Sequence, residues 1–220
     1  MFPVSDVIPS RTTPFVTVGL IALNALAFLV ELSLDERALQ ELVRVFGVVP
    51  ASFSWPAVVT SMFLHGGWLH VLGNMLYLWI FGDNVEDRLG HARYLMVYLF
   101  CGAVAALGQT ATHPQSLVPM IGASGAVAGV MGAYFVLYPH SRVLTAVFII
   151  FVLDLIEIPA IFFLGIWFLM QLFNGVGSIG AETADGGAAF WAHVAGFAAG
   201  AALGGLWRLA GHSQRQRWEC

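Results

Sequence analysis

The chain has 220 residues, of which 59% are hydrophobic and only 10% are charged, and its formal net charge at pH 7 is −4. One core of this size cannot bury so many apolar side chains, so the composition excludes a soluble globular protein and indicates an integral membrane protein. The small charge and the lack of a basic run argue against a nucleic-acid partner. Two cysteines, Cys101 in an apolar run and Cys220 at the last position, do not form a disulfide framework.

Apolar segments along the chain predict an all-α, polytopic membrane protein with six transmembrane helices, because a helix needs roughly 20 residues to cross the hydrocarbon. Residues 1–14 read as a polar tail without the features of a signal or transit peptide, and residues 210–220 as a second tail. The whole of 1–220 is therefore expected to be one membrane domain with its six-helix core at 15–209. The spans are expected at about 15–32, 68–82, 94–110, 122–138, 159–176 and 190–209.

Three connecting segments have distinct compositions. Residues 34–55 carry charges at spacings that suggest short amphipathic helices lying at the membrane interface. Residues 143–158 are apolar but are interrupted by Asp154 and Glu157, and we expect them to lie at the interface as well. A glycine-rich loop at 177–187 precedes the sixth span.

The arginines orient this arrangement through the positive-inside bias. If the N-terminus is inside, six alternating spans leave only Arg37 and Arg44 outside the cytoplasm. Both termini are therefore predicted to be cytoplasmic. The arginines on the predicted cytoplasmic side are Arg11, Arg88, Arg93, Arg142, Arg208, Arg215 and Arg217.

Four polar residues fall inside predicted spans, where polar side chains are costly and mark candidate functional sites: His70, Asn74, Ser124 and His193. Taken alone, each has a structural explanation. A membrane serine can bond the carbonyl one turn back, an asparagine can join two helices, and a histidine near a helix end can lie at the interface. Ser124 and His193, however, each lie fifteen residues before a cytoplasmic helix end, which puts both about 22 Å from those ends and at a matching depth below the external surface.

Glycines predict that the helices carrying this serine and histidine touch. Gly196, Gly200 and Gly204 share one helical face with His193, and the fourth span offers Gly125 and Gly129. Small residues at such spacings let membrane helices approach closely. Ser124 and His193 could then bond directly, with the imidazole acting as general base for the hydroxyl.

Acyl transfer also needs donors for the oxyanion. His70 and Asn74 are four residues apart on one helical face, and Asn74 carries an amide donor. His65 lies too near the interface for a role to be assigned. A metal site is the alternative for these histidines, but their spacing is not usual for ligands and no HExxH motif is present.

No acidic residue is an obvious third member of a catalytic triad. Asp154 and Glu157 fall on the other side of the membrane from His193, and Glu182 and Asp185 lie in the glycine-rich loop. The serine motif is not the G-x-S-x-G elbow of soluble hydrolases, since Ala126 takes its last position. A buried Ser–His dyad is therefore the simplest chemistry.

From about residue 14 to residue 207 the chain resembles the rhomboid intramembrane serine proteases. The motifs that carry the resemblance are HGGWLHVLGNM at 65–75, GASGA at 122–126 and AHVAGFAAG at 192–200, in this order. Two positions depart from the family pattern. Trp55 is followed by Pro56 instead of arginine, and Ala128 replaces the aromatic residue that commonly stacks on the histidine one turn after the serine.

The resemblance implies roles for these residues. Ser124 would be the nucleophile and His193 the general base and acid, while His70, the Asn74 side chain and the backbone N–H of Ser124 would hold the oxyanion. Family members use no metal or cofactor and cleave single-span membrane proteins in the lipid bilayer. The first external loop would lie partly in the membrane, and the fifth span and glycine-rich loop would form the gate for the substrate.

Two other functions stay open at this stage. One is a catalytically inactive rhomboid-like protein that binds membrane helices, although such relatives typically lack the serine or the histidine. The other is a channel or carrier, which would need polar residues across the whole membrane thickness instead of in one half. The short N-terminal segment suits a bacterial or archaeal plasma membrane.

Overall fold

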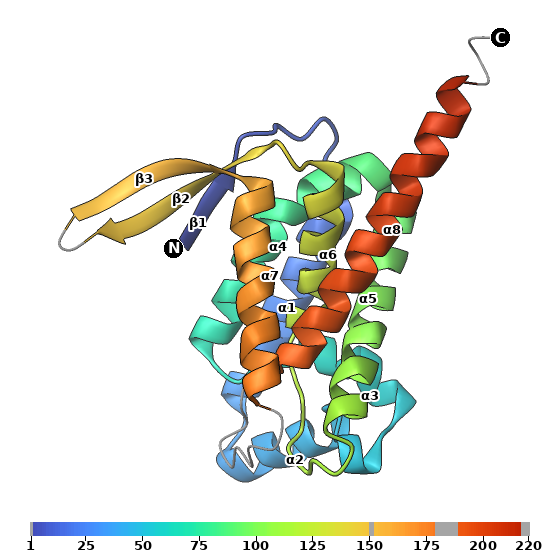
Figure 1. Cartoon of the computed structure of the whole chain (residues 1–220). Coiled ribbons are helices and arrows are strands. Elements are labelled where there is room, and N and C mark those ends of the chain that lie inside the picture. The colour runs from blue at the N-terminus through green and yellow to red at the C-terminus, as the bar shows by residue number, and fades with distance from the viewer. Residues whose placement is uncertain (1, 150–151, 179–188, 217–220) are drawn as a thin grey trace.

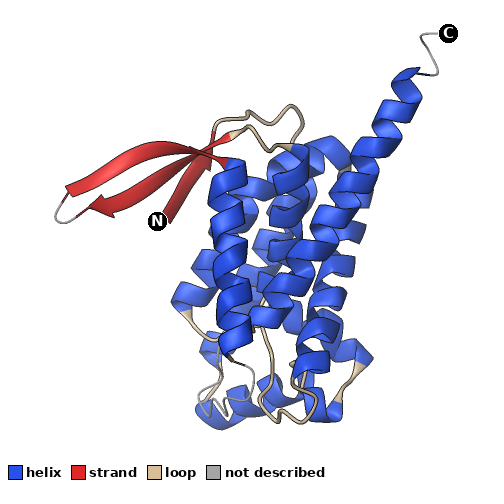
Figure 2. Cartoon of the chain, viewed as in Figure 1, coloured by secondary structure: helices blue, strands red, loops and turns tan. Residues whose placement is uncertain are grey.

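The computed structural model describes residues 2–149, 152–178 and 189–216 and is a helical bundle with a small sheet at one end (Figures 1 and 2). This architecture confirms the predicted fold class, a mostly helical polytopic membrane protein. The helices are α1 (Phe15–Ser33), α2 (Glu36–Phe46), α3 (Trp55–Thr60), α4 (Trp68–Leu89), α5 (His91–Thr112), α6 (Ser124–Leu137), α7 (Ala160–Gly177) and α8 (Phe190–Gln216). The strands are β1 (Phe2–Asp6), β2 (Arg142–Ile149) and β3 (Val152–Pro159).

Each predicted span coincides with a helix, but the helices differ in their capacity to cross a membrane. In the described part of the chain, four segments are long and apolar enough to span a bilayer: α1, α5, α7 and residues 190–210 of α8. Helix α4 carries several charged residues in its last two turns, and α6 has only 14 residues. The count of six membrane crossings therefore stays a prediction.

Helix α6 lies at the centre of the bundle, packed against α4, α5 and α8, and ten of its residues are buried. Its contact with α8 is made by glycines. A Cβ atom on Gly196 would overlap the carbonyl oxygen of Gly125, and one on Gly200 would overlap that of Gly129. The predicted close approach of these two helices is confirmed.

The sheet adds strands that the sequence did not predict. Residues 2–6, expected as part of a polar tail, form β1, and residues 143–149 and 152–158 lie in the antiparallel pair of β2 and β3. The expected position of 143–158 at the membrane interface stays a prediction. Strand β1 pairs antiparallel with β2, which gives the order β1-β2-β3, and the sheet projects sideways from the bundle (Figure 2). An apolar run of this length fits a strand as well as a buried helix. One partner of β2 is β1, which lies more than a hundred residues earlier in the chain, so this pairing cannot be predicted from the local pattern.

The C-terminal boundary is also different from the expected one. Helix α8 continues to Gln216, so residues 210–216 extend the helix instead of forming a tail. Helices need no apolar residues once they leave the bilayer, and hydropathy therefore marks the membrane thickness but not the helix end. Arg217 and Cys220 lie outside the described residues.

The long segment after α1 contains the expected amphipathic helix. Asp35 caps the start of α2 by accepting a hydrogen bond from the backbone N–H of Ala38 at 2.8 Å. None of the residues of α2 is buried, and the helix lies across the end of the bundle opposite the sheet (Figure 1). Its position at a membrane interface stays a prediction.

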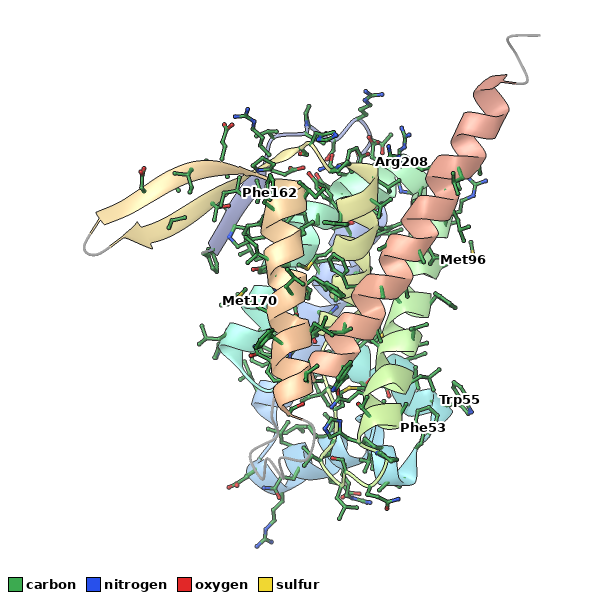
Figure 3. All side chains as sticks on the ribbon, viewed as in Figure 1. Phe53, Trp55, Met96, Phe162, Met170 and Arg208 are labelled. Atoms are coloured by element: carbon green, nitrogen blue, oxygen red, sulfur yellow. The ribbon has the colours of Figure 1, made fainter. Side chains whose placement is uncertain are left out.

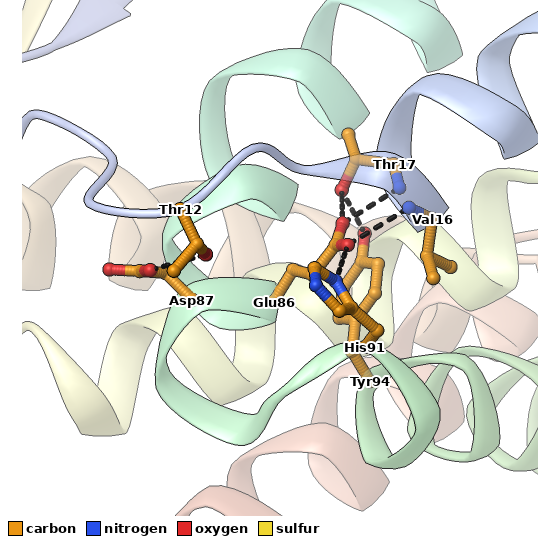
Figure 4. Close-up of polar contacts among 7 residues, drawn as sticks. All are labelled: Thr12, Val16, Thr17, Glu86, Asp87, His91 and Tyr94. Carbon is orange, nitrogen blue, oxygen red and sulfur yellow. Dashed lines mark hydrogen bonds and ion pairs between the residues drawn. The ribbon is translucent and has the colours of Figure 1, made fainter.

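A buried carboxylate holds the start of α1 against the junction of α4 and α5 (Figure 4). Glu86 accepts hydrogen bonds from the backbone N–H groups of Val16 and Thr17 at 2.9 and 2.8 Å and from the Thr17 hydroxyl at 2.7 Å. The Nδ1 atom of His91 lies 2.6 Å from the same carboxylate. The negative charge thus satisfies two free N–H groups at the positive end of the α1 dipole.

Candidate active site

Ser124 is the first residue of α6 and follows a tight glycine turn. Gly122 has φ of +122°, a conformation that L side chains rarely adopt, and its N–H donates to the Ser61 carbonyl at 2.9 Å. A Cβ atom at this position would lie 2.6 Å from Nε2 of His70 and 3.7 Å from Oγ of Ser124. Glycine therefore allows the serine turn to lie directly against the His70 ring.

The segment leading to Ser124 is held by the loop between α2 and α4. Val48 and Met120 exchange two backbone hydrogen bonds, of 3.0 and 2.8 Å, and the Ala51 N–H donates to the Ser116 carbonyl at 3.0 Å. With the bond to Gly122, four backbone hydrogen bonds connect the two segments. These bonds fix the position of the first residue of α6 relative to the segment between α2 and α4.

A cavity of about 700 Å³ opens beside the start of α6. Among its lining residues are all four candidates from the sequence, which come from α4, α6 and α8. The structure therefore brings together side chains that are far apart in the chain. The polar side chains that line the cavity include His70, Asn74, Ser124, His193, Tyr77, Gln109 and Gln171.

Ser124 and His193 share the cavity, but the direct bond expected between them is not formed in the described structure. The Nδ1 atom of His193 instead lies 2.8 Å from Oε1 of Gln171 on α7, and the Trp167 ring packs beside the imidazole with a centroid distance of 5.9 Å. Nε2 is then the nitrogen that remains for a serine hydroxyl. Catalytic contacts are often long in a substrate-free site and close when substrate binds.

His70 is set up as a hydrogen-bond donor toward the serine turn. The backbone N–H of Gly66 donates to Nδ1 of His70 at 3.3 Å. A neutral imidazole that accepts at Nδ1 carries its proton on Nε2, and Nε2 is the atom that lies nearest Gly122. The His70 ring can therefore offer an N–H group close to Ser124.

His65 contacts the site through Asn74 and does not itself line the cavity. It is 3% exposed, and its Nε2 lies 3.1 Å from Nδ2 of Asn74, so the amide donates to the imidazole. Burial, with a smaller effect of the neighbouring His70 ring, lowers the pKa of His65 to about 4 and keeps the ring neutral. One Asn74 N–H is thereby fixed, which orients the other.

The two departures from the family pattern have visible structural counterparts. Ala128 is fully buried in α6, and the ring beside His193 comes from Trp167 on α7. Pro56 occupies the first turn of α3, where its missing N–H costs nothing, and Trp55 packs edge-to-face on Phe53 at 5.1 Å (Figure 3).

Acidic residues do not complete the site in the described part of the chain. Asp154 and Glu157 lie on β3, in the sheet at the opposite end of α6, and Glu157 pairs with Arg142 at 3.2 Å. Glu182, Asp185 and most of the glycine-rich loop lie outside the described residues.

The apolar helices of the bundle define an integral membrane protein, and its polar cavity is the candidate site. The family model described as Rhomboid domain matches residues 52–209, and the chain belongs to the rhomboid family. Similar proteins include mitochondrial Rhomboid protein 1 of Saccharomyces cerevisiae, with 28% identity over 73% of this chain and 44% of that protein. Rhomboid protease GluP of Bacillus subtilis is 36% identical over 38% of this chain and 16% of GluP.

Human mitochondrial presenilin-associated rhomboid-like protein is a third similar protein, with 32% identity over 56% of this chain and 33% of its own length. In all three comparisons the matched segment spans less than half of the relative. The relatives come from a bacterium and from mitochondria, so the location in a bacterial or archaeal plasma membrane stays a prediction. The cytoplasmic position of both termini also stays a prediction.

Proposed function

We propose that this protein is an intramembrane serine endopeptidase that cleaves single-span membrane proteins. The observation that carries the proposal is the shared cavity, which is lined by Ser124 and His193 together with His70 and Asn74. Four polar side chains from three helices rarely converge inside a membrane protein without a functional reason.

In the proposed reaction, Ser124 Oγ attacks the carbonyl carbon of the scissile peptide bond while Nε2 of His193 takes the hydroxyl proton. The tetrahedral intermediate collapses to an acyl-enzyme when His193 returns this proton to the leaving amine. Water then attacks the ester by the same route, and free Ser124 is restored. The bond from Nδ1 of His193 to Gln171 supports this direction of transfer, since it leaves Nε2 as the basic atom.

Three donors are proposed for the oxyanion: Nε2–H of His70, the free amide N–H of Asn74 and the backbone N–H of Ser124. The first N–H groups of α6 have no partner within the helix, and the helix dipole adds positive potential at this end. Donors fixed before the reaction are worth more than solvent donors, since they need no reorganisation in the transition state.

The test is cleavage of a model single-span substrate by purified protein in detergent and in liposomes. We expect Ser124→Ala and His193→Ala to lose cleavage while keeping their helicity, and Ser33→Ala to match the parent, because Ser33 lies at the exposed end of α1. A fluorophosphonate probe should label the parent but not Ser124→Ala. Cleavage that persists in Ser124→Ala would rule out the proposal.

The alternative is a rhomboid-like protein that binds membrane helices without cleaving them. The observation in its favour is the missing direct bond between Ser124 and His193, with His193 bonded to α7 instead. Under this alternative the parent protein and Ser124→Ala would crosslink to the model substrate equally well, and neither the parent nor the variant would react with the fluorophosphonate.

A further inference from the structure

Gln171 on α7 is the polar partner of the proposed general base. Its Oε1 lies 2.8 Å from Nδ1 of His193, and its side chain lines the same cavity as Ser124. Neither the motifs around the serine nor those around the histidine include this residue, which lies on a separate helix.

An amide oxygen can only accept a hydrogen bond. The bond therefore selects the neutral tautomer of His193 that carries its proton on Nδ1, and the lone pair of Nε2 is left for the Ser124 hydroxyl. In the other tautomer Nε2 would carry the proton and could not act as base.

We infer that Gln171 is a positioning residue, which fixes the tautomer and ring orientation of His193 from α7. This inference rests on the proposed function. Helix α6 has no aromatic ring to restrain the histidine, because Ala128 occupies the position one turn after Ser124. Trp167, one turn before Gln171, supplies a ring on the α7 side at 5.9 Å from the imidazole centroid.

The restraint belongs to a continuous contact between α7 and α8. Gly175 lies one turn after Gln171 on the same face, and its carbonyl accepts a hydrogen bond from Nε1 of Trp191 at 3.0 Å. One turn before Gln171, Trp167 also packs against Phe197 with a centroid distance of 6.0 Å. Trp167, Gln171 and Gly175 thus hold α7 to α8 at three levels.

The position of α7 therefore determines whether His193 is oriented for catalysis. The side of α7 away from α8 carries exposed apolar residues, as Phe162 and Met170 illustrate in Figure 3. A movement of α7 away from α8 would separate Oε1 of Gln171 from Nδ1 of His193. The base would be active only while α7 is seated on α8.

The test compares Gln171→Met, which removes the acceptor, with Gln171→Glu, which keeps one. Gln109→Met is the matched control, because Gln109 also lines the cavity and bonds α8, but through the backbone N–H of Ala192 at 3.3 Å. We expect Gln171→Met to lower kcat by about 10-fold or more with little change in KM. Gln171→Glu should retain most of kcat.

The pH profile adds a readout that a purely structural role would not move. The carboxylate of Gln171→Glu stabilises the protonated imidazole, so the acidic limb of kcat should move up by about one pH unit or more. Gln109→Met should leave this limb where it is in the parent. Equal losses in Gln171→Met and Gln171→Glu, or an unmoved limb in Gln171→Glu, would overturn the inference.

A second measurement does not depend on proteolysis. Nitrogen-15 NMR of histidine-labelled Ser124→Ala protein reports the tautomer of His193, which is assigned by the loss of its signals in His193→Gln. We expect the Nδ1–H form with Gln171 present and a mixture of tautomers with Gln171→Met. An unchanged tautomer in Gln171→Met would contradict the positioning role. If the tautomer changes as expected but the parent protein does not cleave the substrate, only the proposed function is contradicted.

Discussion

The side chain of Asn74 is held by His65, and this pair shows how far the site extends beyond the residues proposed to touch substrate. His65 accepts one Asn74 N–H at 3.1 Å, and its own backbone N–H donates to the Glu31 carboxylate at 3.1 and 3.2 Å. The sequence motif contains His65, but its spacing to Asn74 gives no sign that the two side chains meet. Only the turn between them, which includes Gly67 at φ of +151°, brings them together.

His65→Leu should lower cleavage by about 10-fold, because the Asn74 amide loses the partner that orients it. His65→Gln retains an acceptor oxygen and should keep most of the activity. Both variants are compared by kcat on the model substrate, with circular dichroism as the check that each is folded. A fully active His65→Leu variant would show that Asn74 is oriented without His65.

Among the elements, the helices were predictable and the strands were not. Long apolar runs bounded by polar residues define α1 and α7 to within one residue at each end and α5 to within three, because membrane crossing constrains their length and composition. Strands β1 and β2 are hydrogen-bonded neighbours in the sheet, but helices α1 to α6 lie between them in the sequence. The local sequence pattern of either strand carries no information about such a distant partner.

The contact between α6 and α8 gives a sharp prediction, because two glycines of α8 differ completely in their surroundings. A Cβ atom on Gly200 would overlap the Gly129 carbonyl, whereas one on Gly205 would meet nothing within 4 Å. Gly200→Ala should therefore separate the helices, lower the melting temperature by several degrees and reduce cleavage. Gly205→Ala should match the parent in thermal unfolding, and equal melting temperatures for the two variants would disprove the close packing.

The carboxylate cap of α1 is the second prediction for an element. Glu86→Gln replaces a charged acceptor of backbone and hydroxyl donors by a neutral one, and we expect it to lower the free energy of unfolding by about 2 kcal/mol. Glu157→Gln removes an exposed partner of Arg142 and should cost under about 1 kcal/mol. Unfolding in a denaturing detergent, followed by tryptophan fluorescence, compares them.

For the whole molecule, Asp6 joins the sheet to the bundle and makes this connection sensitive to pH. Its carboxylate accepts hydrogen bonds from the Tyr134 hydroxyl at 2.7 Å and from the Asn84 amide at 2.9 Å. Burial, more than any other effect, raises the pKa of Asp6 from 3.8 to about 6. The folded protein thus holds a proton between about pH 4 and pH 6 that the unfolded chain has released.

It follows that the contribution of Asp6 to stability is complete below about pH 4 and is lost as the pH rises through about 6. We expect the amides of β1 to exchange with deuterium faster at pH 7.5 than at pH 5, after correction for the intrinsic rate. Asp6→Asn, which stays neutral, should show the same protection at both values. The opposite order in the parent would mean that the charged carboxylate holds the sheet.

The four site residues proposed from the sequence line one cavity. For Ser124 and His193 this was predictable, since matching depths on glycine-bearing helices constrain where the two side chains can meet. Gln171 could not be found in the same way. A polar residue such as Gln171 on a mostly apolar helix, which also carries Asn174, indicates that a partner exists but does not identify it. The bond to His193 depends on the rotation of α7, which is set by packing along its whole length.

The order of the elements along the chain has a consequence for biosynthesis. Among the helices that the structure describes, α8 is made last, yet it forms the most extensive contact with the central helix α6 and carries His193. Until α8 has left the ribosome, Gly125 and Gly129 can pack against Ala105 and Cys101 of α5, but the side of α6 that meets α8 has no partner helix. The growing chain therefore carries Ser124 without its proposed base, and under the proposed function it cannot cleave a substrate before α8 has been made and packed against α6.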